Sequence, residues 1–391
     1  MSDAHQATAT FNQAHALNEE QLTDCIRACG FDAEWYLKQN VGLLDAGINL
    51  DSALLHFLAH GYNEHRDPLF GAISDGLETI SSLAIPDRRY AAQLVKSVFF
   101  GQLRNPGTPD RLWAGVDGGL IQCVRDHGGL PYFIIGDSHT NHYKIDSWIG
   151  THWLAPLPIV CHGASAIGLA NENSRSQYGQ KILRWAASTA GLQRRFDVPV
   201  FLKFGGIDAE FLWISRRIQK GIHHFSVSEF SDFARESVAK YGQFMDTLAT
   251  TIDPALLRVC SVFPSVLTDA SWTAGYIDAH KGSTEDNRQL ADGLRKLEIP
   301  NSATRTKLRA IYNSYLEDLC TNKGLKYVDD FSPFLDPSGS LDSRYLGAHK
   351  GTDFHLDLDS SSEPLLKIIR ASLAPANNIP TGEPAPPTIA A

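Results

Sequence analysis

Short apolar runs alternate with longer helical patterns from residue 130 onward, and this alternation constrains the fold more than any other feature. Five runs are expected to be strands: residues 132–136, 158–161, 200–205, 258–263 and 326–329. Helical patterns lie between them, around residues 142–148, 177–190, 228–250 and 303–322. Apolar strands that alternate with helices form mainly parallel sheets with both faces covered. We therefore predict an α/β fold with a mainly parallel five-stranded sheet.

Length and charge exclude several classes of protein. The 391 residues are enough for a full core and more than one domain. A net charge of −9 and a pI near 5.9 argue against a nucleic-acid partner or an anionic lipid surface. No apolar run approaches the ~20 residues of a membrane span. Residues 1–20 lack a signal-peptide pattern, and the six cysteines are scattered. We therefore expect reduced thiols and a cytoplasmic location. We also expect no cofactor and no bound metal.

Composition divides the chain into five predicted segments. Residues 1–20 and the Pro- and Ala-rich tail 375–391 are expected to be disordered. Residues 21–75 are expected to form a small helical module, 76–129 a helical connector and 130–374 the α/β domain. Within that domain, the polar stretch 268–302 is typical of an insertion or a lid.

The small module has a recognisable pattern. Gly61 is expected to end a helix, with Pro68 beyond it. Residues 31–70, which begin FDAEWYL and include HFLAHG, resemble short modules that accompany glycosyltransferases of bacterial polysaccharide synthesis. His56 and His60 lie one helical turn apart and are compatible with a metal pair, but without a third ligand packing is the favoured interpretation.

The first strand ends in Gly136-Asp137-Ser138, and this is the candidate nucleophile site. Ligands of parallel sheets gather at the carboxyl ends of the strands, where Ser138 would lie beside free backbone N–H groups. A serine that caps a helix accounts for the same pattern when the pattern stands alone. To act as a nucleophile, Ser138 also needs a base and donors for an oxyanion.

Glycines follow the next two strands. Gly163 would let the backbone approach a ligand without a Cβ in the way, although a turn glycine is the commoner explanation. Gly205 and Gly206, two glycines before an acid, also suggest backbone close to a ligand. Asp208 lies two positions after Gly206 and is expected to cap the helix that follows it.

The candidate base is His355, which follows the last strand by about 25 residues. Asp353 precedes it by two positions and would orient the imidazole in the manner of a Ser-His-Asp triad. His349 is the rival base. His355 is favoured because an acid and an apolar residue flank it.

Together these blocks resemble the SGNH (GDSL-like) hydrolase superfamily in order and spacing, over residues 130–373. The resemblance implies a three-layer α/β/α sandwich, with Ser138 as nucleophile, His355 as base and an aspartate on the same loop. It also implies oxyanion donors from the N–H groups of Ser138 and Gly163 and from an asparagine side chain. Members of the superfamily are esterases, lipases, carbohydrate deacetylases and O-acetyltransferases.

The chain departs from the family pattern at two positions. Ile207 stands where the oxyanion asparagine is expected, and the loss of such a donor costs roughly 10²–10³ in turnover. His162 and Asn171 are the nearest alternative donors. The usual Asp-x-x-His is shortened to Asp353-Phe354-His355, with Thr352 at the expected position of the acid.

Three functions compete at this stage. The favoured one is a serine esterase or O-acyltransferase that acts on acetyl or other O-acyl groups of a carbohydrate, with polysaccharide biosynthesis enzymes as partners; Asp137 and His139 are grouped with its oxyanion and substrate site. The second is an inactive SGNH-fold protein for glycan binding or assembly, which Ile207 favours. The third is a metallo-hydrolase built on His139, His142 and His162, whose spacing matches no recognised ligand pattern.

Overall fold

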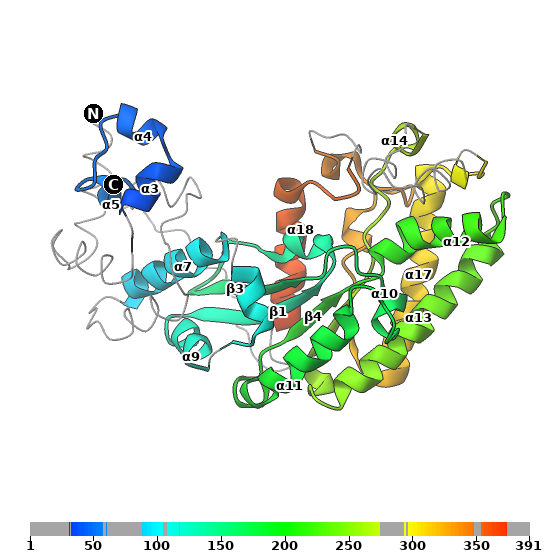
Figure 1. Cartoon of the computed structure of the whole chain (residues 1–391), viewed down its shortest axis with the longest axis horizontal. Helices are drawn as coiled ribbons and strands as arrows, with labels where there is room; N and C mark the ends of the chain where they lie inside the picture. Colours follow the sequence, from blue (N-terminus) through cyan, green and yellow to red (C-terminus); the bar gives the residue numbers. More distant parts are fainter. Residues whose placement is uncertain are drawn as a thin grey trace, which may run out of the picture. The chain divides into compact units, whose positions relative to one another are not determined.

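The computed structural model describes most of the chain, and two compact units can be distinguished in it (Figure 1). One unit contains the described residues up to Pro131 together with Asp146–Ala155, and the other contains Tyr132–Ile145 and the described residues from Pro156 onward. The described residues are 31, 33–57, 60, 88–104, 108–116, 118–273, 293–294, 296–347 and 353–373. The two predicted disordered ends and most of the predicted lid lie outside them. The predicted domain boundaries remain predictions.

The structure confirms an α/β fold around a mainly parallel sheet. The sheet has six strands in the order β2-β3-β1-β4-β5-β6. They are β1 (Gly129–Gly136), β2 (Trp148–Ile149), β3 (His152–Val160), β4 (Val200–Lys203), β5 (Leu257–Cys260) and β6 (Lys326–Val328). β4 pairs in parallel with β1 and β5, as β5 does with β6, whereas β2 pairs antiparallel with β3.

The prediction of five strands was therefore one short. β2 was missed because two residues carry no period that a sequence pattern can reveal. All five predicted runs correspond to strands. The parallel pairings β1–β4, β4–β5 and β5–β6, and the hydrogen bond from the Cys161 N–H to the Gly136 carbonyl, place the carboxyl ends of these strands together.

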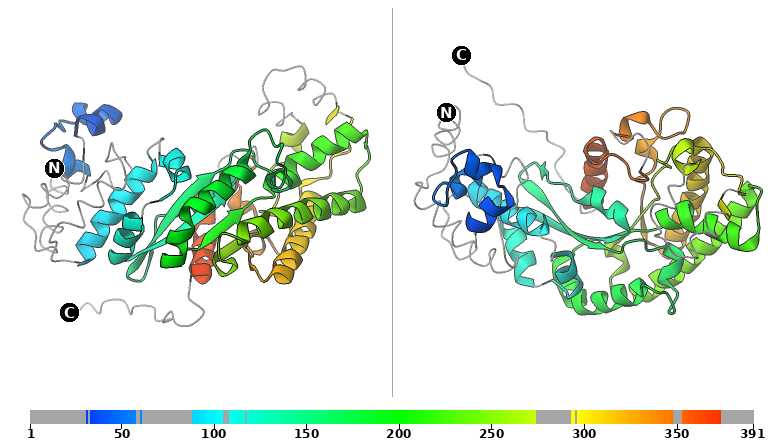
Figure 2. Two further views of the ribbon diagram at one scale, coloured as in Figure 1. Left: turned by 60° about the horizontal axis from the view of Figure 1, so that its bottom comes forward. Right: turned by 45° about the horizontal axis from the view of Figure 1, so that its top comes forward.

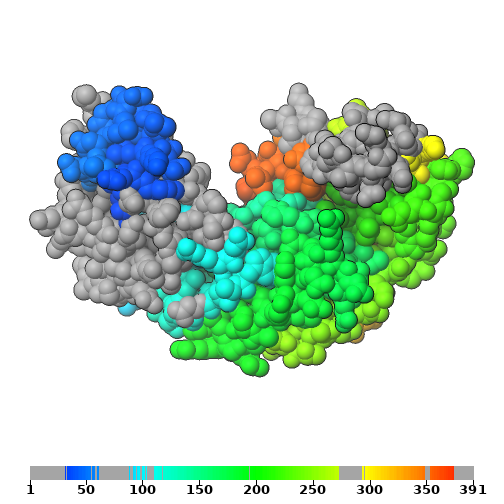
Figure 3. All heavy atoms as spheres, viewed as in Figure 1, coloured from blue at the N-terminus to red at the C-terminus, as the bar shows by residue number. Residues whose placement is uncertain are grey.

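Helices cover both faces of the sheet in the second unit. Figure 2 shows α11 and α13 on one face and α18 on the opposite face. The space-filling view in Figure 3 shows the first of these faces covered by the green segments. The helices are α10 (Ala166–Leu169), α11 (Tyr178–Phe196), α12 (Trp213–Lys220), α13 (Val227–Ala249), α14 (Asp269–Thr273), α17 (Ser302–Lys323) and α18 (Leu358–Leu373), with short turns η2 (Ser138–Tyr143), η3 (Asp208–Leu212), η4 (Pro254–Leu256), η5 (Ser332–Phe334) and η6 (Ser343–Tyr345).

The expected helix at residues 142–148 was wrong. A 3₁₀ turn, η2, ends at Tyr143, and the chain then passes into the edge strand β2. The Tyr132 hydroxyl donates to the Tyr143 carbonyl at 2.6 Å, while the Tyr143 hydroxyl donates to the carboxylate of Asp330. These buried bonds hold the end of η2 in place and occupy a carbonyl that a continuing helix would use.

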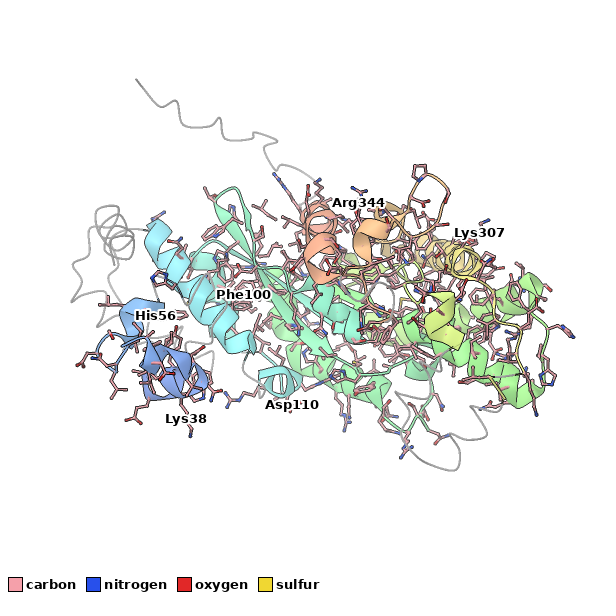
Figure 4. All side chains as sticks on the ribbon, turned by 90° about the horizontal axis from the view of Figure 1, so that it is seen from above. Lys38, His56, Phe100, Asp110, Lys307 and Arg344 are labelled. Atoms are coloured by element: carbon pink, nitrogen blue, oxygen red, sulfur yellow. The ribbon has the colours of Figure 1, made fainter. Side chains whose placement is uncertain are left out.

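The first unit contains short helices and an aromatic cluster. Its helices are α3 (Ala33–Gln39), α4 (Gly42–Asp45), α5 (Ala53–His56), α7 (Arg88–Arg104), α8 (Thr108–Trp113) and α9 (Gly118–Asp126). His56, labelled on α5 in Figure 4, shares a 3.0 Å hydrogen bond with the Tyr36 hydroxyl. Gly61 and Pro68, the expected end signals of this region, lie outside the described residues. None of the described helices is long and apolar enough to cross a membrane.

Candidate active site

The site lies at the shared carboxyl edge of β1, β4, β5 and β6. Gly136 ends β1 opposite Lys203, the last residue of β4. A Cβ added at Gly136 would lie 2.1 Å from the Lys203 carbonyl oxygen, so only glycine fits between these two strand ends. The close approach brings the Asp137–Ser138 turn beside the Gly205–Gly206 turn, as the sequence pattern predicted.

Ser138 and His355 meet across 217 positions of sequence. The Ser138 Oγ lies 2.7 Å from the His355 Nε2. Ser138 is the first residue of η2, and His355 lies just before α18, which packs on η2. This packing places a nucleophile and a base within hydrogen-bond reach.

Asp353 extends the Ser138–His355 contact through a local turn. Its Oδ1 accepts both the ring Nδ1–H of His355, at 2.9 Å, and the backbone N–H of the same residue, at 3.3 Å. Because Nδ1 donates to the carboxylate, the lone pair of a neutral ring is on Nε2, facing Ser138. An acid two residues before the histidine can thus orient the ring despite the shortened spacing. The rival base His349 and the alternative acid position Thr352 lie outside the described residues.

Burial and charge tune both members of this pair. Burial lowers the pKa of His355 below its ordinary value, the neighbouring His139 lowers it further, and Asp353 acts in the opposite direction. Burial would raise the pKa of Asp353, but His355 and the backbone N–H groups outweigh it, so that pKa is lowered. The base is therefore neutral, and the acid ionised, at neutral pH.

Asp137 and His139 form a second pair of the same design. The Asp137 Oδ1 accepts the backbone N–H of His139 at 2.9 Å and its ring Nδ1–H at 2.7 Å. Both residues are buried. Burial would raise the pKa of Asp137, but the bonds and charge of His139 lower it overall. A Cβ added at Gly206 would lie 3.0 Å from the His139 Cε1, so Gly206 lets the third strand end approach this ring.

Gly163 lies on an exposed turn with φ at +68°, and open space surrounds the position of its missing Cβ. Its loop leads into α10, whose first turn is held by Asp208. The Asp208 carboxylate accepts the N–H groups of Ala166 at 2.6 Å and Ile167 at 3.0 Å, as well as the Ser237 hydroxyl at 2.8 Å. Burial raises the pKa of Asp208.

The prediction for Asp208 was therefore wrong about the helix that it binds. Asp208 was predicted to cap the helix that follows it, but its carboxylate instead accepts the N–H groups of Ala166 and Ile167 at the start of α10, 42 and 41 residues earlier in the chain. The sequence could not reveal this because the segments after β3 and β4 come together only through the sheet, in which both strands lie beside β1.

Gly205 is explained by packing. Its φ is +104°, and an added Cβ would lie 2.8 Å from the Tyr312 Cε1 and 2.9 Å from the Val262 Cγ2.

The two alternative oxyanion donors, His162 and Asn171, are both exposed, and the Asn171 Oδ1 accepts the Asn173 N–H at 3.0 Å in a local turn.

The sequence interpretation missed a buried ion pair beneath the strand ends. The Lys203 Nζ donates at 2.5 Å to the Asp330 Oδ2 and at 2.5 Å to the Ser261 carbonyl, joining β4, β5 and the end of β6. The Tyr143 and Ser261 hydroxyls also donate to Asp330. A lysine inside the apolar run Val200–Lys203 was the available signal, since buried lysines require a partner.

His142 adds a third imidazole to the region. Its Nδ1 lies 3.1 Å from the Ser361 Oγ, and its ring centroid is 6.4 Å from that of His139. Burial holds the pKa of His142 well below its ordinary value. No group of three or more His, Cys, Asp or Glu within the described part of the chain is arranged to hold a metal ion. The metallo-hydrolase alternative therefore gains no support.

Comparison with known proteins finds similarity to solved structures only. No family model and no curated protein sequence matches the chain. One similar structure is a GDSL-like lipase from Bacteroides thetaiotaomicron, 11% identical, with a TM-score of 0.34 and coverage of 69% of this chain and 97% of that chain. An extracellular lipase from Streptomyces rimosus is 13% identical, with a TM-score of 0.34 and coverage of 62% and 99%. A phospholipase A1 from Streptomyces albidoflavus is also 13% identical, with a TM-score of 0.32 and coverage of 62% and 98%.

A mainly parallel sheet with helices on both of its faces gives this chain an α/β fold of the predicted type (Figure 2). The Gly136–Ser138, Gly163, Gly205–Asp208 and Asp353–His355 blocks, which carry the resemblance to the SGNH/GDSL-like hydrolases, lie along one edge of this sheet.

Proposed function

We propose that the protein is a serine esterase or O-acyltransferase that acts on O-acyl groups, chiefly acetyl groups, of a carbohydrate. The observation that carries the proposal is the hydrogen-bonded row from the Ser138 Oγ through His355 to the Asp353 carboxylate, at 2.7 Å and 2.9 Å. A glycan-binding protein with no catalysis would need neither this alignment nor a base whose pKa is lowered.

The geometry supports a two-step mechanism. The Ser138 Oγ attacks the acyl carbonyl carbon while its proton passes to the His355 Nε2, which then protonates the departing alcohol oxygen. Asp353 holds the ring and stabilises the imidazolium. Water, or a sugar hydroxyl, then attacks the acyl-Ser138 ester with His355 as base. The first acceptor gives hydrolysis, and the second gives acyl transfer.

Two backbone donors are proposed for the oxyanion. The N–H of Ser138 begins η2 and has no intrahelical acceptor, and the N–H of Gly163 lies on the exposed turn held by Asp208. Ile207 offers no donor in the place of an asparagine amide, so we expect turnover below that of an enzyme with three donors.

The carbohydrate context is the associational part of the proposal. It is supported by the resemblance of residues 31–70 to modules of polysaccharide glycosyltransferases. We further propose a cytoplasmic location and polysaccharide biosynthesis enzymes as partners. A useful screen is release of acetate from O-acetylated bacterial polysaccharides, run with and without an unacetylated acceptor sugar. Acyl transfer would appear as acetylated acceptor.

A fluorophosphonate probe tests the serine chemistry directly. Wild-type protein should be labelled on Ser138, identified by peptide mapping, and Ser138→Ala and His355→Gln should not be labelled at a comparable rate. Ser362→Ala is a matched control, because Ser362 is half-buried on α18 and its hydroxyl donates to a backbone carbonyl of the same helix. A folded wild-type protein that is never labelled, hydrolyses no acyl ester and still binds an oligosaccharide would overturn the enzyme in favour of the binding protein.

A further inference from the structure

Two Asp-x-His segments of the same design meet at the site, and only one has a role in the proposed mechanism. In each, a single carboxylate oxygen accepts the backbone N–H and the ring Nδ1–H of the histidine two residues later. Asp353 and His355 serve Ser138 in this way. Asp137 and His139 repeat the arrangement on the first strand end, with the shorter ring-to-carboxylate distance of 2.7 Å.

The two imidazoles are close enough to compete for a proton. The ring centroids of His139 and His355 are 5.0 Å apart, at an interplanar angle of 50°. The Phe354 ring lies tilted against the His355 ring, with centroids 3.9 Å apart, and meets His139 edge-on at 5.3 Å. Phe263 meets His139 at 5.6 Å. With aromatic carbon filling these sides, two positive charges at this separation would be poorly screened, so the rings are expected to titrate as a coupled pair.

The counter-charges of the two rings differ in burial. The Asp137 side chain is 1% exposed, whereas the Asp353 side chain is 47% exposed. A positive charge on His139 therefore has a carboxylate whose field water barely weakens, while a positive charge on His355 has a carboxylate that solvent screens.

Two other charged residues in the described part of the chain act on Asp137, and each is ion-paired with another carboxylate. Lys203, on β4, acts on Asp137 but is ion-paired with Asp330. Arg309, on α17, also lies within electrostatic reach of Asp137 and is ion-paired with Glu210.

His142, on η2, is a further titratable neighbour within the part of the chain that the structure describes. Its ring faces both other imidazoles and has the Ser361 hydroxyl, rather than a carboxylate, as its partner. Among the described residues, Asp137 is thus the carboxylate bonded to the His139 ring.

We propose that His139 is a positioning residue for His355: the His139–Asp137 pair accepts the first proton that enters this cluster and leaves His355 unprotonated, ready to receive the proton of Ser138, in mildly acidic solution. The lowered pKa of His355, to which His139 contributes after burial, agrees with this direction. The consequence for catalysis rests on the proposed function, whereas the order of protonation does not.

The order can be measured without any substrate. The full chain, labelled with ¹⁵N-histidine, is titrated by NMR through mildly acidic pH, and the ring signals are assigned with His139→Gln, His142→Gln and His355→Gln. In the wild type, the His139 ring should gain its proton at a higher pH than the His355 ring. In His139→Gln, the titration midpoint of His355 should rise by about 1 pH unit, a tenfold gain in proton affinity.

His142→Gln is the matched control. Its ring lies 6.2 Å from that of His355 but has no carboxylate partner, so its removal should move the His355 midpoint by less than about 0.3 pH units. If His139→Gln does not fold, Asp137→Asn keeps an oxygen for the turn while removing the charge, and it should let His355 take the first proton. The proposal is overturned if His355 protonates first in the wild type. It is equally overturned if neither His139→Gln nor Asp137→Asn moves the titration midpoint of His355.

The two proposals can fail separately. If wild-type protein is not labelled on Ser138 but the order of protonation is as predicted, the proposed enzyme activity fails and the proposal for His139 stands. Labelling of Ser138 with the opposite order would keep the enzyme and remove the role of His139.

Discussion

Replacement of Asp353 by asparagine should separate the charge of the acid from its orienting role. The Asp353 Oδ1 accepts two N–H groups of His355, one from the ring and one from the backbone. In Asp353→Asn the amide oxygen must stay in this position, because an amide NH₂ there would face two donors. The His355 ring should therefore keep its tautomer, and the variant should lose only the negative charge.

The size of the loss follows from the exposure of this carboxylate. Two unit charges about 4 Å apart interact by ~1 kcal/mol in water and by ~4 kcal/mol at an effective dielectric constant of about 20. The Asp353 side chain is 47% exposed, which favours the lower part of that range. A loss of about 2 kcal/mol in transition-state stabilisation corresponds to roughly 30-fold in kcat/KM. Asp353→Ala also releases the ring, so we expect roughly 10²–10³-fold.

The assay is hydrolysis of p-nitrophenyl acetate by wild type, Asp353→Asn, Asp353→Ala and Ser138→Ala at neutral pH, with thermal melts to confirm folding. The expected order of kcat/KM is wild type, then the Asn variant, then the Ala variant, then Ser138→Ala. An Asn variant that is as slow as the Ala variant, or slower, would mean that the tautomer has switched. The double hydrogen bond would then not control the ring, and the reasoning would be refuted.

Three further predictions concern stability. Lys203→Met leaves the buried Asp330 carboxylate unpaired and should lower the free energy of unfolding by roughly 3–5 kcal/mol in urea titrations, with part of the loss recovered in Lys203→Met/Asp330→Leu; equal losses in both would contradict the ion-pair account. Gly136→Ala puts a Cβ 2.1 Å from a β4 carbonyl oxygen, so soluble expression or the melting temperature should fall sharply, and an unchanged melting curve would show that the strands can separate. His142 takes up a proton on unfolding because burial lowers its pKa well below 6.5 in the folded state, so the free energy of unfolding should drop as pH falls below 6.5, by about 2 kcal/mol at pH 5, and this pH dependence should shrink in His142→Gln.

Much of the fold was predictable because most residues of the longer strands are apolar and the two longest helices carry their own end signals. Ser226 caps α13 and Asn301 caps α17, for example, and both signals are local. The 3₁₀ turn at Ser138–Tyr143 was not predictable as such, because the bonds from Tyr132 and to Asp330 that stop it come from distant segments. β2 was too short to leave a pattern.

The candidate site was predictable in outline for a related reason. Parallel strands end at one edge, so a glycine-serine turn after β1 and a histidine after β6 must approach one another. The 2.7 Å contact between Ser138 and His355 also needs α18 to pack on η2, which no residue spacing reveals.

By itself, the sequence determined the α/β class, the strand ends at which chemistry was to be sought, and the residue types of nucleophile, base and acid, because periodicity and local turn chemistry are properties of short segments. Only the tertiary structure decided how those residues are paired. It joined Asp208 to the start of a helix 42 residues earlier, gave the buried Lys203 its Asp330, and set two Asp-x-His pairs side by side with different exposure. These outcomes depend on which distant segments share a buried space, and in such a space the loss of water determines where a charge needs a partner.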